Sequence, residues 1–329
     1  MKVLIPNYPT TDSFVDNVAF TLRAMGHEVV TPVRPLDRFR SGPARFLTRA
    51  WRQAFPEHWT PGERFALAAA RQSAPDLVLC LTQSLRQEVI ENLRGLGARR
   101  MVAWWGDPPA NMEGLGLLAD GWDHIFIKDA AAVAKFRAVG QPAELMHEAM
   151  NPAWHRRAFS AIGDEVAVAG SYYGYRQFLV RRLMAAGVPM ALHGPRPPRW
   201  ADPAISAAAT GRFIVRDEKS AVFGSALACL NSTTLSEGDS LNCRAFEIAG
   251  AAGLQLIENK PMVADCFEPG REVLVYRSVE DIVDYLARAR SEPAWAMSIR
   301  EAGHARANAE HSYRHRLDVL LKRAGLGAA

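Results

Sequence analysis

The residues best suited to chemistry stand just before a predicted helix that starts at Arg244. Ser240, Leu241 and Asn242 lead into this helix, so small polar side chains lie where free backbone amides and the helix dipole favour a phosphate group. Arg244 would add a charge-assisted clamp on that anion. Glu247 follows one turn later on the same side and could accept hydrogen bonds from two sugar hydroxyls. The pattern indicates a nucleoside-diphosphate site; the alternative interpretation is a capped helix with an Arg–Glu surface pair.

Two more anion-binding signals occur at predicted strand ends in the same half of the chain. Gly170 and Ser171 follow one predicted strand directly and precede a helix, so their amides could meet an anion at the helix N-terminus. His193 and Gly194 occupy the same kind of position after the next predicted strand. Together with the segment before Arg244, these strand ends predict one phosphate-binding region.

The pattern of the surrounding elements indicates parallel sheets, whose strand ends would bring these residues together. Short Val-, Ile- and Leu-rich runs alternate with helical patterns along the chain, which is typical of strands buried on both faces of such a sheet. In the first half we predict strands over residues 2–5, 28–31, 76–81, 100–105 and 124–127. In the second half we predict strands over residues 165–169, 189–193, 213–215, 227–231 and 254–257. The intervening helices are predicted over residues 13–25, 63–72, 84–93, 175–186, 219–225, 244–251 and 279–290.

The alternation predicts an α/β fold with two Rossmann-like, doubly wound parallel-sheet domains. We expect a first domain over residues 1–150, a hinge near Asn151 and a second domain over residues 151–310. The final segment, 311–329, contains a predicted helix over 311–323 that could pack back on the first domain. Because ligands bind beyond the carboxyl ends of parallel strands, two such domains facing each other would make a central cleft.

Motifs for metals and nucleotide loops are missing from the sequence. It has no D-x-D triplet, no H-E-x-x-H and no G-x-x-x-x-G-K-[ST], so no metal site and no P-loop are predicted. Gly114 and Gly116 match the spacing of the dinucleotide fingerprint, but prolines rather than a strand precede them. His311 and His315 have no third ligand nearby in sequence, which favours a solvated helix face. The cysteines form no C-x-x-C pair, which indicates a reducing compartment and no structural zinc.

Composition narrows the possible partners. The chain has 329 residues, which fits two domains at about 150 residues each. Its net charge is only +4 and neither half is strongly basic, which argues against dedicated nucleic-acid binding. No apolar run approaches the length of about 18 residues that a membrane span needs, and the apolar stretch at the N-terminus is too short for a signal peptide. We therefore expect a soluble, cytoplasmic protein.

The segment from Arg34 to Trp59 is basic and rich in aromatic residues. In it, Arg45, Arg49 and Arg52 lie beside an apolar face at helical spacing. Basic amphipathic helices can lie on anionic membranes or bind an acidic partner, so a peripheral membrane contact is one interpretation. The other is a helix that packs on its own domain and exposes its basic side to solvent.

Several motifs in the second half match one known family. Four residues form an N-x-R-x-F-E core: Asn242, Arg244, Phe246 and Glu247. A second run, F-x-P-G-x-E-x-x-x-Y, consists of Phe267, Pro269, Gly270, Glu272 and Tyr276. Shorter matches are the turn Gly170-Ser171-Tyr172 and the tail Ser312-Tyr313-Arg314-His315-Arg316. With these motifs the chain resembles the bacterial CgeB-like glycosyltransferases, which are related to spore-maturation proteins.

The resemblance implies a GT-B fold and transfer of a sugar from a nucleoside-diphosphate sugar to an acceptor. That acceptor would be a glycan, a protein, a lipid or a small molecule. No cofactor and no metal are expected beyond the donor, because helix-start amides and an arginine would meet its charge. The donor contacts implied are Gly170, Ser171, Tyr172, His193, Gly194, Ser240, Leu241, Asn242, Arg244 and Glu247.

The stereochemistry of transfer stays open at this point. Retaining GT-B enzymes of the commonest type carry E-x7-E, whereas nine residues separate Glu237 from Glu247, so the role of Glu237 is not assigned. An inverting enzyme would need a base from the first domain. Asp107 and Asp12 both follow predicted strands there, and we prefer Asp107 as the catalytic residue, although Asp before proline is also a common turn residue.

Two other classes of function compete with this prediction. A non-catalytic module would bind a nucleotide sugar or another anion without turnover. A glycosyltransferase acting on DNA or at a membrane surface would use the segment from Arg34 to Trp59 to hold its acceptor.

Overall fold

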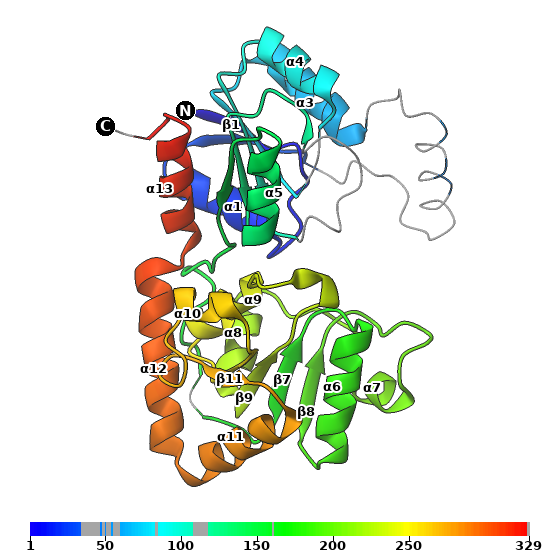
Figure 1. Ribbon diagram of the computed structural model, residues 1–329, viewed down its shortest axis with the longest axis vertical. Coiled ribbons are helices and arrows are strands. Elements are labelled where there is room, and N and C mark those ends of the chain that lie inside the picture. The colour runs from blue at the N-terminus through cyan, green and yellow to red at the C-terminus, as the bar shows by residue number, and fades with distance from the viewer. Residues whose placement is uncertain are drawn as a thin grey trace. The chain divides into compact units, whose positions relative to one another are not determined.

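The computed structural model describes residues 1–33, 60–82, 85–107, 118–159 and 161–327, together with Leu47, Ala50 and Ala54. Apart from those three residues, the basic segment from Arg34 to Trp59 lies outside this part of the chain, as do Gly114 and Gly116. The chain divides into two compact units, Met1–Met146 with Leu317–Ala329, and His147–Arg316. Both are parallel α/β structures (Figure 1). None of the described helices combines the length and the apolar character needed to cross a membrane.

The described residues of the first unit form a six-stranded parallel sheet in the order β2-β1-β3-β4-β5-β6. Its strands are β1 (Lys2–Leu4), β2 (Glu28–Val30), β3 (Leu77–Leu81), β4 (Arg100–Trp105), β5 (His124–Ile127) and β6 (Ala143–Leu145). The helices between them are α1 (Phe14–Ala24), α3 (Pro61–Gln72), α4 (Gln87–Gly95) and α5 (Ala130–Ala138). Strand order reverses between β1 and β3, which is where ligands of such sheets bind.

Burial on both faces explains why these strands are continuous apolar runs. All five residues of β3 are buried, and successive side chains point to opposite faces. Val78 and Cys80 pack in the core formed with α3 and α4. On β4, Trp104 meets the ring of Phe14 from α1 edge-on, with centroids 4.9 Å apart.

The last helix, α13 (Tyr313–Arg323), begins two residues later than the predicted start at His311. Helix α12 ends at Glu310, and Ser312 pairs with Met150 in a short parallel bridge, so the chain cannot be helical there. From Leu317 onward α13 belongs to the first unit.

The second unit has a five-stranded parallel sheet among its described residues, in the order β11-β10-β9-β7-β8. Its strands are β7 (Val166–Ala169), β8 (Met190–His193), β9 (Ala228–Asn231), β10 (Gln255–Glu258) and β11 (Leu274–Tyr276). Its helices are α6 (Gly174–Ala185), α7 (Pro203–Ala208), α8 (Arg216–Ser225), α9 (Cys243–Gly250), α10 (Pro261–Cys266), α11 (Val279–Ser291) and α12 (Pro293–Glu310), with a 3-10 turn, η3, at Leu235–Glu237.

Alternate residues of β7 face two different helix layers. Val166 and Val168 pack in the core that α6 and α11 cover. Ala167 and Ala169 pack in the core that α8 and α9 cover. Strand order reverses between β7 and β9, so the carboxyl ends of these two strands form the switch point of the second unit.

The predicted α/β fold with two parallel sheets is confirmed, but the strand predicted over residues 213–215 is wrong. This segment is irregular and leads directly into α8. Ile214 is buried beneath α8, whereas Phe213 is exposed, so the apolar run is not a strand buried on both faces. Arg216 has a φ of +50°, which turns the chain into the helix.

His311 is buried, although its position predicted a solvated helix face. Its ring lies against Phe246 and Phe267, with centroids 5.0 and 5.2 Å away. Nε2 lies 2.8 Å from the carbonyl oxygen of Cys266, and Nδ1 lies 3.0 Å from Nη2 of Arg316. Because arginine only donates, the ring accepts at Nδ1 and donates from Nε2. Burial lowers the pKa of His311 to about 4, so the ring is neutral near neutral pH.

We expect the protein to lose stability as the pH falls from about 6.5 toward 4. In that window the unfolded chain binds a proton on His311 and the folded chain does not, so each pH unit removes up to about 1.4 kcal/mol from the free energy of unfolding. Above about pH 6.5 His311 is neutral in both the folded and the unfolded chain, so the free energy of unfolding no longer changes through this group. Urea unfolding at about pH 7 and about pH 4.5 measures the effect. His311→Gln keeps one donor and one acceptor and should reduce the difference in the free energy of unfolding between the two pH values. An equal difference in both proteins would show that His311 does not cause the pH dependence.

Candidate functional site

Two glycines close the carboxyl ends of β7 and β8. Gly170 has a φ of +117°, and a Cβ added there would lie 2.7 Å from Nη2 of Arg244 and 3.0 Å from Nη1 of Arg176. A Cβ on Gly194 would lie 2.2 Å from the carbonyl oxygen of Gly170. The Gly170 amide donates to the carbonyl oxygen of His193 at 2.8 Å. Glycine at both positions lets the strand ends approach closely and leaves room for two guanidinium groups.

Arg176 joins these turns from inside the unit. It lies in the first turn of α6 and is buried. Its Nε donates to Oγ of Ser232 at 3.0 Å, its Nη2 to the carbonyl oxygen of Ser232 at 2.6 Å, and its Nη1 to that of Ser171 at 2.8 Å. Burial, followed by the positive charge of Arg244, lowers the pKa of Arg176 to about 10. Two neighbouring guanidinium groups of like charge favour an anion between or beside them.

Arg244 lies in the first turn of α9, which Asn242 caps. The Asn242 Oδ1 accepts from the amide of Ala245 at 3.2 Å, and its Nδ2 donates to Oδ1 of Asn231 at 3.0 Å. The other amides of this first turn have no acceptor within the helix. Among the described residues, no group forms a hydrogen bond or an ion pair with the Arg244 guanidinium. Gly170, Arg176, Arg244 and the first turn of α9 therefore form a positively charged site, the arginine cradle.

The other predicted donor contacts around the cradle differ in whether their side chains are buried or exposed. The hydroxyl of Ser240 is buried and donates to the carbonyl oxygen of Glu237 at 2.8 Å. Leu241 packs in the core beneath α9, so these two residues shape the loop and leave only main-chain groups for a ligand. Ser171 is exposed beside the Gly170 turn. Tyr172 is buried, and its hydroxyl has no hydrogen-bond partner in the described part of the chain.

Glu247 is part of a buried ionic cluster that the sequence did not predict. Its Oε1 accepts from Nζ of Lys219 at 2.9 Å, and Nε2 of His155 lies 3.7 Å from the same oxygen. The amide of Asn151 donates to Nδ1 of His155 at 3.0 Å, which leaves the ring proton on Nε2, facing the carboxylate. Within the described ranges Oε2 of Glu247 has no hydrogen-bond donor, so it can accept from a ligand.

His193 supplies an aromatic group at the end of β8. Burial, followed by the charge of Arg212, lowers the pKa of His193 below its usual value. Arg212 itself is paired with Glu218 at 2.6 Å. The Nδ1 of His193 is buried and has no hydrogen-bond partner among the described residues. A neutral imidazole with an unused nitrogen therefore lies beside the Gly194 turn.

The two predicted base residues lie in loops that follow strands of the first unit. Asp107 is exposed and follows β4 after a single residue, Gly106. Asp12 lies between β1 and α1 with a φ of +60°, and its amide donates to Oδ2 of Asp16 at 2.8 Å. The Oδ1 of Asp12 also accepts from Nδ2 of Asn17 at 3.3 Å. Asp107 thus has the more exposed carboxylate, whereas Asp12 is held by its own loop and helix.

Residues 176–322 match the model of a family described as glycosyl transferase-like. No curated protein matches the chain in sequence. The structure is similar to sucrose-phosphate synthase from Thermosynechococcus elongatus, with a TM-score of 0.68 and 14% identity over 98% of each chain. The fold is GT-B.

Two further solved structures are similar to this chain over 98–99% of its length. Anabaena Alr3699/HepE, solved in complex with UDP and glucose, has a TM-score of 0.64 and 10% identity over 98% of this chain and 99% of its own. The trehalose-6-phosphate synthase OtsA has a TM-score of 0.62 and 11% identity over 99% of each chain. The parallel sheets of the two units are therefore those of a GT-B protein.

Proposed function

We propose that this protein is a glycosyltransferase that takes its sugar from a nucleoside-diphosphate sugar. The observation that carries the proposal is the Arg244 guanidinium, which has no protein partner among the described residues and lies against Gly170 at the switch point of a GT-B unit. The glycosyl transferase-like match over residues 176–322 and the likeness to a structure solved with UDP and glucose support this class of donor. The sequence motifs that resemble the CgeB-like family support the same assignment.

The arginine cradle fits a leaving diphosphate. Glycosyl transfer passes through an oxocarbenium-like state, and the departing diphosphate gains negative charge as the glycosidic bond breaks. Arg244 and the first-turn amides of α9 are fixed donors directed at that charge, and such preorganised donors stabilise it without reorganisation. We expect them to act without a metal, so that transfer continues when divalent ions are chelated.

The nucleoside would lie between the ends of β7 and β8 and the buried cluster around Glu247. Oε2 of Glu247 is available to accept from ribose hydroxyls, while Nζ of Lys219 donates to Oε1 and fixes the orientation of the carboxylate. His193 offers an unused ring nitrogen to the base or the sugar. The first unit would then hold the acceptor.

The base would come from the first unit if transfer inverts the anomeric centre. We propose Asp107, with Asp12 as the alternative, because each follows a strand of that sheet. The anomeric configuration of the product, read by NMR, decides between inversion and retention. An asparagine variant of the base should lose transfer and still bind UDP; if transfer inverts and both variants keep it, neither residue is the base.

A thermal-shift series with nucleoside diphosphates tests the proposed function. A ligand present at about 100 times its dissociation constant should stabilise the protein by about 2.7 kcal/mol. Release of the nucleoside diphosphate from the sugar donor on adding acceptor then separates an enzyme from a binding module. A panel of uridine, guanosine, thymidine and adenosine diphosphates that produces no shift would overturn the proposal, and binding without release under any acceptor would leave a non-catalytic module.

A further inference from the structure

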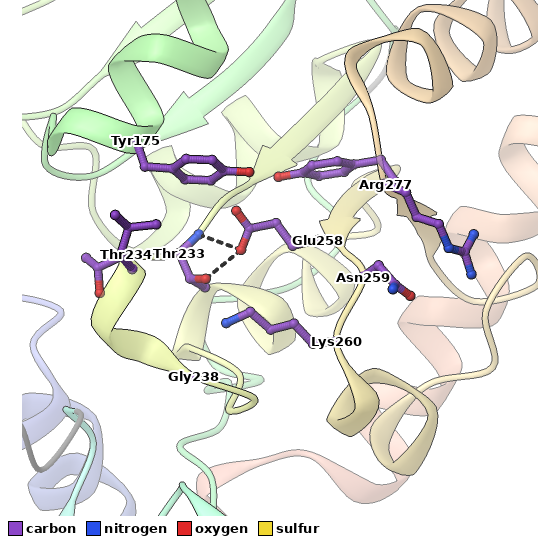
Figure 2. A pocket seen from close by; sticks show the side chains of 10 residues that line it. Tyr175, Thr233, Thr234, Gly238, Glu258, Asn259, Lys260 and Arg277 are labelled. Atoms are coloured by element: carbon purple, nitrogen blue, oxygen red, sulfur yellow. Dashed lines mark hydrogen bonds between the residues drawn. The ribbon is translucent and has the colours of Figure 1, made fainter.

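A pocket distinct from the arginine cradle lies at the carboxyl ends of β9, β10 and β11. The proposed transfer uses none of the residues that line it. Its volume is about 520 Å³, within the range of about 300–1,000 Å³ found for small-ligand pockets. The walls include Tyr175, Thr233, Glu258, Asn259 and Lys260 (Figure 2). Tyr276 also lines the pocket. Hydroxyl, amide and carboxylate groups dominate this set, with two aromatic rings.

Glu258 occupies the middle of the pocket, with Tyr175 on one side and Lys260 on the other (Figure 2). One carboxylate oxygen, Oε2, accepts from the amide of Thr233 at 3.2 Å and from its hydroxyl at 2.5 Å. The Tyr175 hydroxyl also interacts with this carboxylate. The other oxygen, Oε1, is buried and forms no hydrogen bond of standard length with a described residue. Thr233 thus fixes the orientation of the carboxylate, with Tyr175 beside it, and Oε1 keeps acceptor capacity for a ligand.

Tyr276 provides a second unused polar group. It is the last residue of β11, only 4% of it is exposed, and its hydroxyl has no hydrogen-bond partner among the described residues. Burial, followed by the negative charge of Glu258, raises the pKa of Tyr276 well above its usual range. The phenol therefore stays protonated and can both donate and accept.

The unused groups select one kind of ligand. Buried polar groups in proteins are normally hydrogen-bonded, so the Glu258 oxygen needs a donor and the Tyr276 hydroxyl needs a partner of either kind. A ligand hydroxyl donates one hydrogen bond and accepts others, so neighbouring hydroxyls on one ring satisfy both. The Glu258 carboxylate lines the pocket together with the Lys260 and Arg277 cations, so the lining offers both acceptors and donors to neutral hydroxyls. A neutral polyhydroxyl ring meets all these conditions.

We propose that this pocket is a sugar-binding site that holds a neutral hexose unit separately from the arginine cradle. The two sites meet at the end of β9, because Arg176 binds Ser232 and the pocket wall begins at the next residue, Thr233. The proposal stands without the proposed transfer, since it rests on Glu258 and Tyr276 and not on the cradle.

Saturation-transfer difference NMR on the full chain tests the site with glucose, galactose, mannose and N-acetylglucosamine as probes. We expect at least one hexose to bind, and saturating UDP to leave its signal in place. Glu258→Gln and Tyr276→Phe should each weaken binding about tenfold or more. Tyr285→Phe is the matched control, because its hydroxyl donates to the Val275 carbonyl oxygen at 3.2 Å and does not line the pocket.

Three results would overturn the proposal: no signal from any of the hexoses, unchanged affinity in the folded variants, or loss of the signal when UDP is added. Thermal melting confirms that each variant is folded. If the two buried variants fail to fold, Thr234→Trp, at the half-exposed wall, should block the pocket and abolish binding. UDP binding measured on the same samples separates failure of this site from failure of the proposed transfer.

Discussion

Replacing Arg244 by alanine is expected to slow sugar transfer by about 10²–10³-fold. The guanidinium lies beside the Gly170 turn and the first turn of α9, where the leaving diphosphate would develop its charge. The affinity for UDP should fall about tenfold or more, because hydrogen bonds to charged groups contribute about 1.5–3 kcal/mol each. Titration calorimetry with UDP and the rate of transfer measure the two effects separately.

The Arg244→Ala protein should remain folded. No described residue forms a hydrogen bond or an ion pair with the Arg244 guanidinium, and its removal relieves repulsion with Arg176. Arg182→Ala is the matched control, since Arg182 is an exposed arginine on α6. A folded Arg244→Ala protein that binds UDP as tightly as the unchanged chain would show that the cradle is not the diphosphate site.

Replacing Glu247 by alanine is expected to reduce the free energy of unfolding by about 3–5 kcal/mol. Glu247 and Lys219 are both buried and lie 2.9 Å apart, so the change leaves a buried ammonium without this carboxylate. It also removes the group that His155 faces at 3.7 Å. Urea unfolding monitored by circular dichroism measures the loss.

Two further variants serve as controls for the Glu247→Ala measurement, one at the surface and one that replaces the whole ion pair. Asp284→Ala, at an exposed position on α11, should change the free energy of unfolding by no more than about 0.5 kcal/mol. Combining Glu247→Leu with Lys219→Met replaces the pair by apolar groups and should cost less than Glu247→Ala alone. Unchanged stability of the Glu247→Ala protein would refute the role of this pair.

The sequence predicted the sheets best where strands are buried on both faces. β3, β4 and β7 are continuous apolar runs, and the structure places them inside their sheets. β6 and β11, which have three residues each and lie at sheet edges, were not predicted, although the equally short edge strand β2 was. For residues 213–215 a strand was predicted where none exists, because an apolar run with one buried side chain does not require a strand.

The cradle could be predicted only in part. Gly170, Asn242 and Arg244 were visible because strand ends and helix starts have local signatures. Arg176 could not be predicted as part of the cradle, because its position depends on hydrogen bonds to Ser232, which lies 56 residues away in sequence. The same holds for Lys219, whose carboxylate partner lies 28 residues away. Side-chain direction was equally hidden, and Ser240 and Leu241 turn inward although their neighbours lie beside the cradle.

A crystal structure of the full chain grown with saturating UDP is the most direct test of the diphosphate site. We expect the two phosphate groups at the start of α9, within hydrogen-bond distance of the Arg244 guanidinium and next to the Gly170 turn. UDP bound at another place in the chain, with Arg244 still without a partner, would contradict the assignment of this cradle to the leaving diphosphate.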